Sequence, residues 1–413
     1  MKVWGTVATR VVWVVWACTA TIARAQTLPS EPIALAGGRV TVGGDISASF
    51  GSDDVGFFDY TDYSNSALRL LRIDVSAAVK AGPHFTVLAE VRTENLGEVR
   101  PYALFLRIRP WMARDFDIQV GRVPPTFGAF PRRTYANDNP LIGYPLAYQY
   151  LTTLRPDALP ATADELLRKR SLGWEVGYSI GDSTREAGVP LVTAFRWDTG
   201  VQAHTTIGMV SLTGAVTTGT VSNPLFSDDN DGHQYVTRAE LRPVSGLVVG
   251  TSFARGPFVS LAASRAALGG ETDGNAFTQT AWGGDVEYSR GYYVLRAETI
   301  FSAWRLPAPA VPPAQRAIDG DLTAFATSIE GRYKLMPGLY AAARYDNLTF
   351  GEITGATLGT LPWDAPVARI ELGAGYSLQR NLLLKASFQH NTRDGGVLQR
   401  TSNLTAAQIV FWF

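Results

Sequence analysis

Apolar and polar residues alternate along most of this chain, in consecutive stretches of about 9 to 14 residues. In one such stretch, 369–377, Ile370 and Leu372 point to one side, whereas Arg369 and Glu371 point to the other. A period of two is typical of a β-strand whose faces meet different surroundings. Because many stretches carry charges opposite an apolar face and no helical pattern covers either face, the sequence predicts an all-β, transmembrane antiparallel β-barrel with lipid outside and a water-filled lumen inside.

The composition is typical of a protein made of strands and turns. The 413 residues include 40 Gly and 11% aromatic residues, but only 4 Met. No window beyond residue 25 holds 18 or more consecutive apolar residues, so a helical membrane protein is not expected. The chain has 37 basic and 37 acidic residues, and this balance gives no indication of a nucleic-acid partner.

The connections between the predicted strands alternate in length. Short turns such as 80–83 and 335–338 separate longer polar or Pro-rich segments such as 257–275. This rhythm is typical of short periplasmic turns and long outer loops. An even number of strands then places both ends of the barrel on the periplasmic side.

We predict 18 strands, the first at 39–50 and the last at 400–413, with 16 as the alternative if 203–222 is not a hairpin about Thr213 and Gly214. A strand is predicted at 170–181, and the weakest part of the alternation is 190–222, with predicted strands at 190–199, 203–211 and 214–222.

The amino terminus has the three parts of a secretory signal peptide. A basic start at Lys2 precedes an apolar stretch at 11–20 and a small-x-small cleavage site at 23–25. We therefore divide the chain into a signal peptide, residues 1–25, and a barrel, residues 26–413. The single cysteine, Cys18, falls in the removed part, and its lipidation is the alternative reading.

The last strand ends in alternating apolar residues, with Ile409, Phe411 and the terminal Phe413 on one face. This end resembles the carboxy-terminal signature of bacterial outer-membrane barrels. The resemblance implies a location in the outer membrane of a Gram-negative bacterium, among its lipid and lipopolysaccharide. It also implies recognition of Phe411 and Phe413 by the barrel-assembly machinery.

A second resemblance lies at 118–128, which reads Ile-Gln-Val-Gly-Arg-Val-Pro-Pro-Thr-Phe-Gly. This passage resembles the one that leads into the pore-narrowing loop of general and phosphate-selective porins. The resemblance implies that the long segment 123–169 folds inward as a constriction loop. Pro124, Pro125 and Thr126 stand where those porins have a basic-x-Pro pattern, so their ligand preference is not carried over.

The content of this long segment also favours an inward position. Long loops without regular structure are usually functional. This one carries seven basic and four acidic residues between 122 and 170, and a short helix is expected at 161–170 with Thr162 as its cap. It also carries aromatic residues that need cover, which are Phe127, Phe130, Tyr135, Tyr144, Tyr148 and Tyr150. The alternative is an outer loop that lies over the barrel mouth.

Basic and acidic residues recur two positions apart on the polar face of one strand after another, as in Arg238/Glu240 and Arg344/Asp346. Such pairs form either a lattice that stiffens the wall or a charged track that guides a polar solute. The residues that we expect to line the pore or its constriction are Glu90, Arg92, Arg107, Arg109, Arg122, Arg132, Arg133, Arg155, Arg296, Glu298, Arg344, Arg369 and Glu371.

These observations predict a channel for passive diffusion of small hydrophilic solutes, with a mild anion preference as the finer expectation. No catalytic residue, metal or cofactor is expected, and a homo-oligomer is left open. One alternative is a closed structural or adhesive barrel. A second is an outer-membrane hydrolase, for which His390 beside Asn391 is the only suggestive pair. The acidic run 228–232 is read as a solvated loop, with calcium binding as its alternative.

Overall fold

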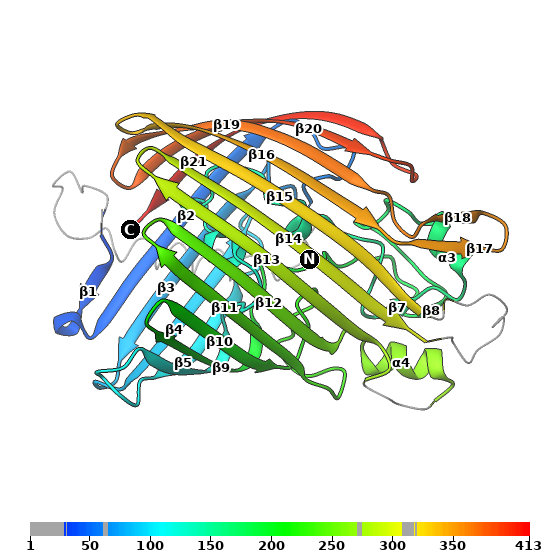
Figure 1. The fold of residues 1–413 in the computed structure, drawn as a ribbon, viewed down its shortest axis with the longest axis horizontal. Helices are drawn as coiled ribbons and strands as arrows, with labels where there is room; N and C mark the ends of the chain where they lie inside the picture. Colours follow the sequence, from blue (N-terminus) through cyan, green and yellow to red (C-terminus); the bar gives the residue numbers. More distant parts are fainter. Residues whose placement is uncertain (1–28, 30, 61–64, 271–274, 308–317, 319) are drawn as a thin grey trace, which may run out of the picture.

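A computed structural model describes residues 29, 31–60, 65–270, 275–307, 318 and 320–413. The predicted signal peptide and Cys18 lie outside the described residues. The described chain forms one large antiparallel sheet of 17 strands, which curves until its first and last long strands meet (Figure 1).

Sixteen of these strands form a closed ring, in which each strand pairs with its neighbours in the sequence and the last pairs with the first. Their bounds are β2 (Val40–Gly51), β3 (Leu71–Lys80), β4 (Phe85–Glu94), β5 (Arg100–Ile108), β6 (Phe116–Val123), β9 (Asp198–Ile207), β10 (Val210–Thr217), β11 (Gln234–Val244), β12 (Leu247–Pro257), β13 (Thr278–Arg290), β14 (Tyr293–Leu306), β15 (Gly320–Met336), β16 (Leu339–Phe350), β19 (Val367–Gln379), β20 (Leu382–Arg393) and β21 (Thr401–Trp412). The seventeenth, β1 (Ile33–Leu35), pairs only with the start of β2.

The prediction of 18 barrel strands is therefore wrong, and the alternative of 16 fits the ring. Two predicted strands, 170–181 and 190–199, lie almost entirely in the segment between β6 and β9. The hairpin of β9 and β10 does form, but it turns at Gly208 and Met209. The reason for the error is that Val176, Tyr178 and Leu191 are buried among other parts of this segment. Burial that alternates, as at Val176 and Tyr178, has the same period as in a barrel wall, whereas 190–195 is a continuous buried run.

The shorter elements all lie in the connections or before β2. They are η1 (Ala36–Gly38), η2 (Phe130–Arg133), α2 (Leu146–Gln149), β7 (Ala158–Leu159), α3 (Ala163–Arg168), β8 (Ile180–Gly181), α4 (Leu261–Leu268), β17 (Glu352–Gly355) and β18 (Gly359–Pro362). The predicted helix cap is confirmed, because the Thr162 hydroxyl accepts the backbone N–H of Glu165 at 3.1 Å. No helix of the described residues is long and apolar enough to cross a membrane.

The two ends of the barrel differ as the alternation of turns predicts. Connections of a few residues, such as 245–246 and 337–338, join the strands at one end, where β2 begins and β21 ends. The longer connections, among them 52–70, 124–197 and 258–277, emerge at the other end (Figure 1). In the orientation that the sequence predicts, the first end is periplasmic and the second is outer.

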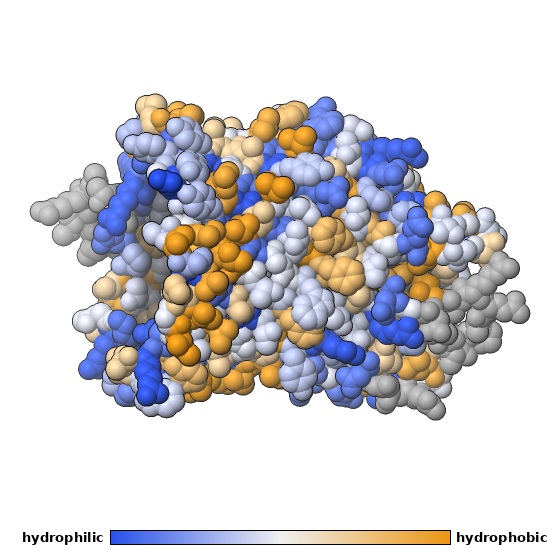
Figure 2. Space-filling model, in the orientation of Figure 1, coloured by the Kyte–Doolittle hydropathy of each residue, from blue (hydrophilic) through white to orange (hydrophobic). Residues whose placement is uncertain are grey.

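The outer face of the wall is apolar where the alternation predicts it. Ile370, Leu372 and Tyr376 on β19 are 47%, 50% and 45% exposed, and apolar side chains gather over the strands in Figure 2. The register of β19 is therefore confirmed. Arg369 and Glu371 do face inward, but they do not face water, since both are buried beneath parts of the chain that fill the barrel.

We expect Ile370→Arg to destabilise the barrel by about 2–4 kcal/mol, because a guanidinium would have to enter lipid. Unfolding by urea from lipid vesicles measures this loss. Glu352→Arg on the β17 hairpin is the matched control, since Glu352 is exposed outside the ring. Equal stability of the two variants would show that Ile370 does not contact lipid.

The carboxy terminus closes the ring. The backbone of Phe413 exchanges two hydrogen bonds with Gly44 on β2, at 3.0 and 3.1 Å. The Phe413 ring lies over Gly44, where an added Cβ would stand 2.7 Å from Cε1 of the ring. Phe411 lies beside it, with the two ring centroids 6.0 Å apart. A residue without a side chain at position 44 is therefore what allows the terminal aromatic residue to seal the seam.

Gly44→Val should displace the Phe413 ring and lower the yield of closed barrel, because the added side chain occupies the place of the ring. The fraction that migrates as the compact, heat-modifiable form on a gel measures closure. Gly82→Val is the control, since no atom lies within 4 Å of a Cβ at position 82. If both variants give the wild-type yield, the packing of Phe413 on Gly44 does not contribute to closure.

Candidate functional site

Residues 124–197, here called the inner segment, connect β6 to β9 and lie against the inner wall of the barrel (Figure 1). The segment is longer than the predicted loop 123–169 because the two strands expected at 170–181 and 190–199 belong to it. Hydrogen bonds join it to opposite parts of the ring, from Tyr135 to Glu90 on β4, from Gly143 to Glu371 on β19, and from Gln279 on β13 to Leu191. This segment therefore occupies the interior rather than lying only across the mouth.

Its aromatic side chains form an apolar core inside the barrel. Six of them are no more than 4% exposed, and these are Phe127, Phe130, Tyr144, Tyr148, Tyr150 and Phe195. They belong to one cluster with small wall residues that point inward, which are Ala215, Ala254, Ala281, Ala324 and Ala326. Alanine at these wall positions leaves the room that the inner segment fills.

Lys385 anchors the inner segment at a single point on β20. Its ammonium donates hydrogen bonds to the backbone carbonyls of Ala136, Asn139 and Leu141, at 2.8, 3.1 and 3.1 Å. The side chain is 4% exposed. A buried ammonium requires such partners, so it holds the turn at 136–141 against the wall. No sequence motif marks this lysine. Apart from Arg393 at the last position of the strand, it is the only basic residue on the inward face of β20.

Charged residues of the wall pair mainly across strands. Glu287, Arg296, Glu330, Arg344 and Glu371 stand side by side on β13, β14, β15, β16 and β19, with alternating sign. The ion-pair distances along this row are 2.6, 2.9, 3.4 and 2.6 Å. Opposite charges on adjacent strands stabilise the wall, which supports the lattice interpretation of the recurring pairs.

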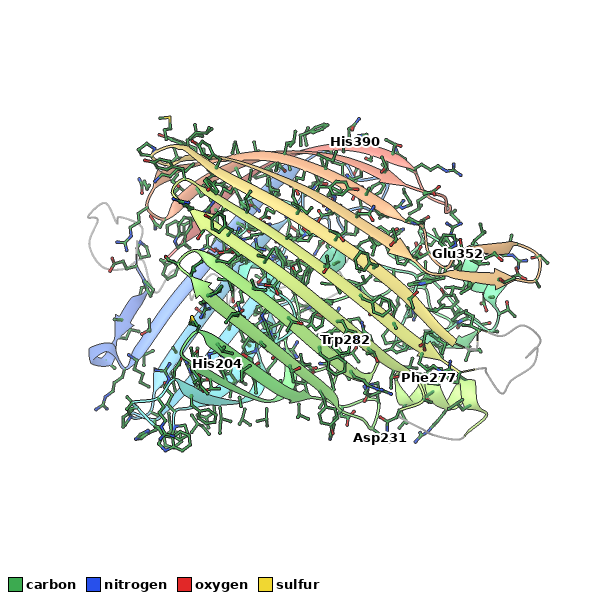
Figure 3. The ribbon with its side chains drawn as sticks, viewed as in Figure 1. His204, Asp231, Phe277, Trp282, Glu352 and His390 are labelled. Carbon is green, nitrogen blue, oxygen red and sulfur yellow. The ribbon has the colours of Figure 1, made fainter. Side chains whose placement is uncertain are left out.

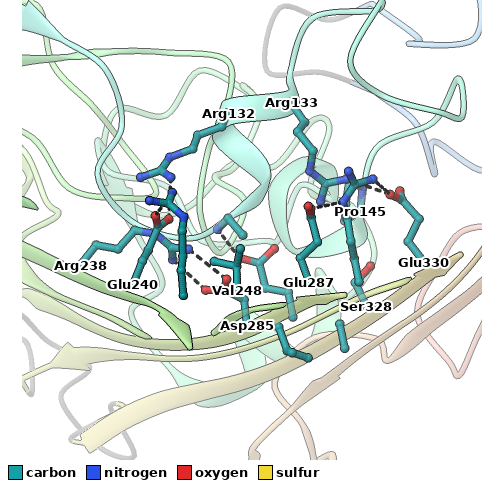
Figure 4. A pocket seen from close by; sticks show the side chains of 16 residues that line it. Arg132, Arg133, Pro145, Arg238, Glu240, Val248, Asp285, Glu287, Ser328 and Glu330 are labelled. Carbon is teal, nitrogen blue, oxygen red and sulfur yellow. Dashed lines mark hydrogen bonds and ion pairs between the residues drawn. The ribbon is translucent and has the colours of Figure 1, made fainter. Parts of the chain in front are cut away.

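The inner segment adds two arginines to this lattice. Arg132 pairs with Glu240 on β11 at 2.5 Å, and Arg133 pairs with Glu330 on β15 at 2.8 Å. Glu240 already pairs with Arg238 and Arg242 on its own strand. Adjacent residues of η2 thus reach two strands that lie four places apart in the ring, and between them lies an open cavity (Figure 4).

This cavity has a volume of about 200 Å³. Its charged lining comes from η2 and from strands β11, β13, β14 and β15, and comprises Arg132, Arg133, Arg238, Glu240, Arg242, Asp285, Glu287, Arg296, Glu298 and Glu330. In Figure 4 these side chains form two groups, one around Glu240 and one around Glu330 and Glu287, with Val248 between them.

Exposure separates the two signs of charge around Glu240. Arg132 and Arg242 are each 51% exposed, whereas the carboxylate of Glu240 that they share is 4% exposed. Elsewhere in the ring, on β5 next to β4, Arg107 is 34% exposed and its partner Asp117 is 2% exposed. A solute beside Glu240 therefore meets guanidinium groups, whereas Glu287 at the other side of the cavity is 39% exposed.

The opposite side of the lumen is acidic. A second cavity, of about 460 Å³, is lined by Asp45, Asp74 and Glu90 on β2 to β4, and by Tyr135 and Asp138 of the inner segment. Asp45 and Asp74 stand directly opposite each other across β2 and β3. The Tyr135 hydroxyl lies within 2.9 Å of both carboxylate oxygens of Glu90.

The remaining predicted lining residues lie in different surroundings. Arg92 is buried, pairs with Asp74 at 2.5 Å and lies over the Tyr102 ring. Arg122 donates to the Tyr102 carbonyl, and Arg109 is exposed in the turn after β5. Glu298 is bound by the Tyr148 hydroxyl at 2.6 Å.

Arg155 does not line either cavity. It is fully buried within the inner segment, where it pairs with Asp157 and donates to the Val176 carbonyl. Sequence reasoning included it because it counted the charges of the loop without knowing which of them the loop would cover. It also missed Arg242, although the run Arg238, Glu240 and Arg242 has the alternation that marks an inward face.

A second connection, 52–70, docks on the wall through Arg369. The guanidinium lies 3.1 Å from Asp59 and donates to the Phe58 and Tyr144 carbonyls, so it joins this connection to the inner segment. Burial raises the pKa of Asp59 to about 7, even though Arg369 acts in the opposite direction. The connection is thus drawn into the barrel at Asp59.

His390 and Asp231, from the enzyme and metal alternatives, lie far apart on the ribbon in Figure 3, and neither residue lines either cavity. His390 Nδ1 is 2.7 Å from Asn403 Oδ1, but among the described residues no hydroxyl hydrogen bonds to its other ring nitrogen. In the run 228–232, the Asp228 carboxylate accepts two backbone N–H groups of that loop. The described part of the chain holds no group of three or more His, Cys, Asp or Glu residues arranged to bind a metal.

Comparison with protein-family models finds no match, and neither does comparison with curated protein sequences. Solved structures do share the fold. OmpF of Salmonella typhi has a TM-score of 0.54 at 12% identity, over 91% of this chain and 97% of its own. An anion-selective porin from Comamonas acidovorans has a TM-score of 0.53 at 11% identity, over 91% and 99%.

The outer-membrane protein OmpT of Vibrio cholerae is similar in fold as well, with a TM-score of 0.52 at 11% identity, over 91% of this chain and 98% of its own. At such low identity these likenesses establish the fold, which is that of bacterial outer-membrane porins. The shared fold and the apolar outer wall agree with a location in the outer membrane of a Gram-negative bacterium.

Proposed function

We propose that this protein is an outer-membrane channel for passive diffusion of small hydrophilic solutes, with a preference for anions. The observation that carries the proposal lies in the cavity beside the inner segment, where the guanidinium groups of Arg132 and Arg242 are exposed and the Glu240 carboxylate that they share is buried. Selectivity of this kind needs no covalent step, because it depends on pore width and on the charge of the lining.

The inner segment is proposed as the constriction. It carries Arg132 and Arg133 into the cavity on one side, and Tyr135 and Asp138 into the acidic cavity on the other. The part from 129 to 138 therefore stands between the two cavities. A solute that passes from one end of the barrel to the other would travel beside this part of the segment.

A closed barrel is the second candidate, and the apolar core inside the ring is the observation that favours it. A core of buried aromatic side chains gives no path for a polar solute. Current through purified protein in a planar bilayer distinguishes the two candidates, since only a channel conducts. Assembly as a homo-oligomer, and recognition of Phe411 and Phe413 by the barrel-assembly machinery, belong to either candidate as proposals.

Reversing two exposed charges should change the ion preference. We expect Arg132→Glu combined with Arg242→Glu to move the reversal potential in a KCl gradient toward cation preference. The shift should be larger at low salt, because screening is then weaker. Arg265→Glu on α4 is the control, since this exposed residue lies outside both cavities. A reversal potential that stays at the wild-type value would contradict the proposed role of these guanidinium groups.

Shortening the inner segment should widen the path. Replacing residues 131–142 by a short Gly-Ser linker removes the part that Lys385 holds against β20. We expect a marked rise in single-channel conductance, provided that the variant still gives the heat-modifiable band of a folded barrel. Wild-type conductance from a folded variant would remove this part of the segment from the mechanism.

A further inference from the structure

We infer that the cavity beside η2 binds small zwitterions, with the size and charge of an amino acid. This inference rests on the proposed channel function and names the class of solute that the charged lining would favour. It depends on the arrangement of three side chains on neighbouring strands, Arg242 on β11, Val248 on β12 and Glu287 on β13.

At one level of the wall, a basic residue on β11 and an acidic residue on β13 bind each other across β12. At the next level they do not. In the first row Glu240, Gly250 and Asp285 are register partners. An added Cβ at Gly250 would stand 2.4 Å from the Asp285 carboxylate and 2.6 Å from the Arg238 guanidinium. Because position 250 has no side chain, Arg238 reaches across β12 and binds Asp285 through two hydrogen bonds, at 2.8 and 2.9 Å.

Val248 is the next inward residue of β12 after Gly250, on the side of the short turns. Its register partner on β13 is Glu287. Arg242 and Glu287 are thus separated by two strand spacings, or about 10 Å of backbone. They do not bind each other. Arg242 turns to Glu240 at 3.2 Å, and Glu287 turns to Arg296 at 2.6 Å. The cavity is the gap that remains between these two groups (Figure 4).

The exposed charges at the two sides of the gap are opposite. Arg132 and Arg242 are each 51% exposed on one side, and Glu287 is 39% exposed on the other. All three are already held by neighbours, so a ligand would meet them in place. A carboxylate suits the pair of guanidinium groups, and an ammonium group suits Glu287.

The same geometry offers a ligand with one sign of charge fewer partners than a zwitterion. A simple anion would gain only the two guanidinium groups, and a simple cation would gain only Glu287. The volume of about 200 Å³ is smaller than the roughly 300–1,000 Å³ of pockets for drug-sized ligands. A molecule of a few heavy atoms that carries both charges therefore satisfies the cavity best.

The test compares β-alanine with propionate and propylammonium, which have a similar size but one charge each. In planar bilayers we expect β-alanine to halve the KCl conductance at a concentration about fivefold lower than either relative, as one additional exposed ion pair allows. Glu287→Gln should remove its advantage over propionate, and Arg242→Gln its advantage over propylammonium. Glu352→Gln and Arg265→Gln, both outside the cavity, should preserve both advantages.

Broadening of the ligand methylene signals in NMR, with the folded barrel in detergent, reports binding even if no current flows. Selective broadening of the β-alanine signals that is lost in Glu287→Gln would support the site. If the barrel conducts no current but shows this broadening, the site stands and the channel proposal fails. Equal binding of propionate and β-alanine would overturn the zwitterion site. So would a conducting barrel on which none of the three compounds acts, and the channel proposal would then stand alone.

Discussion

The backbone pairing of β21 with β2 is the constraint on which the rest of this structure depends. A strand in lipid has no water to bond its N–H and C=O groups, so a sheet can cross a bilayer only when it has no free edge. Here the last strand meets the first along Asp45–Gly51, and Phe413 extends the pairing to Gly44. Once the ring is closed, every inward side chain shares one limited interior, and each charge there must find a partner within it.

The interior meets this demand in two ways. Near the inner segment, the wall charges pair across strands, and the segment contributes Arg132 and Arg133 as additional partners. Where the segment has no side chain to offer, its backbone carbonyls accept hydrogen bonds, as at Lys385. The free-energy cost of burying an unpaired charge is far larger than the net stabilisation from each of these pairs. The main effect of the lattice is therefore to remove that cost, so that the inner segment can pack against the charged wall.

The resulting surface inside the lumen is not the average of its residues. Burial removes Glu240 and Asp117 from contact with solutes but leaves Arg242 and Arg107 accessible. On the other side, Asp45, Asp74 and Glu90 are themselves buried, and Asp138 is the exposed acidic residue of the second cavity. The chain therefore has equal numbers of basic and acidic residues, but they are not equally accessible in each part of the lumen. The proposed selectivity depends on this unequal exposure.

The sequence by itself determined the class of fold, the alternation of turns and the outward set of residues on a strand such as β19, because period two and turn chemistry are local properties. It also marked the cap of α3 through Thr162. Only the tertiary structure decided that 170–181 and 190–199 belong to the inner segment, that Arg155 is buried and Arg242 exposed, and that Lys385 holds the turn at 136–141. These outcomes depend on which surfaces meet inside a closed ring. Contacts between residues that are more than a hundred positions apart leave no periodic trace in the chain.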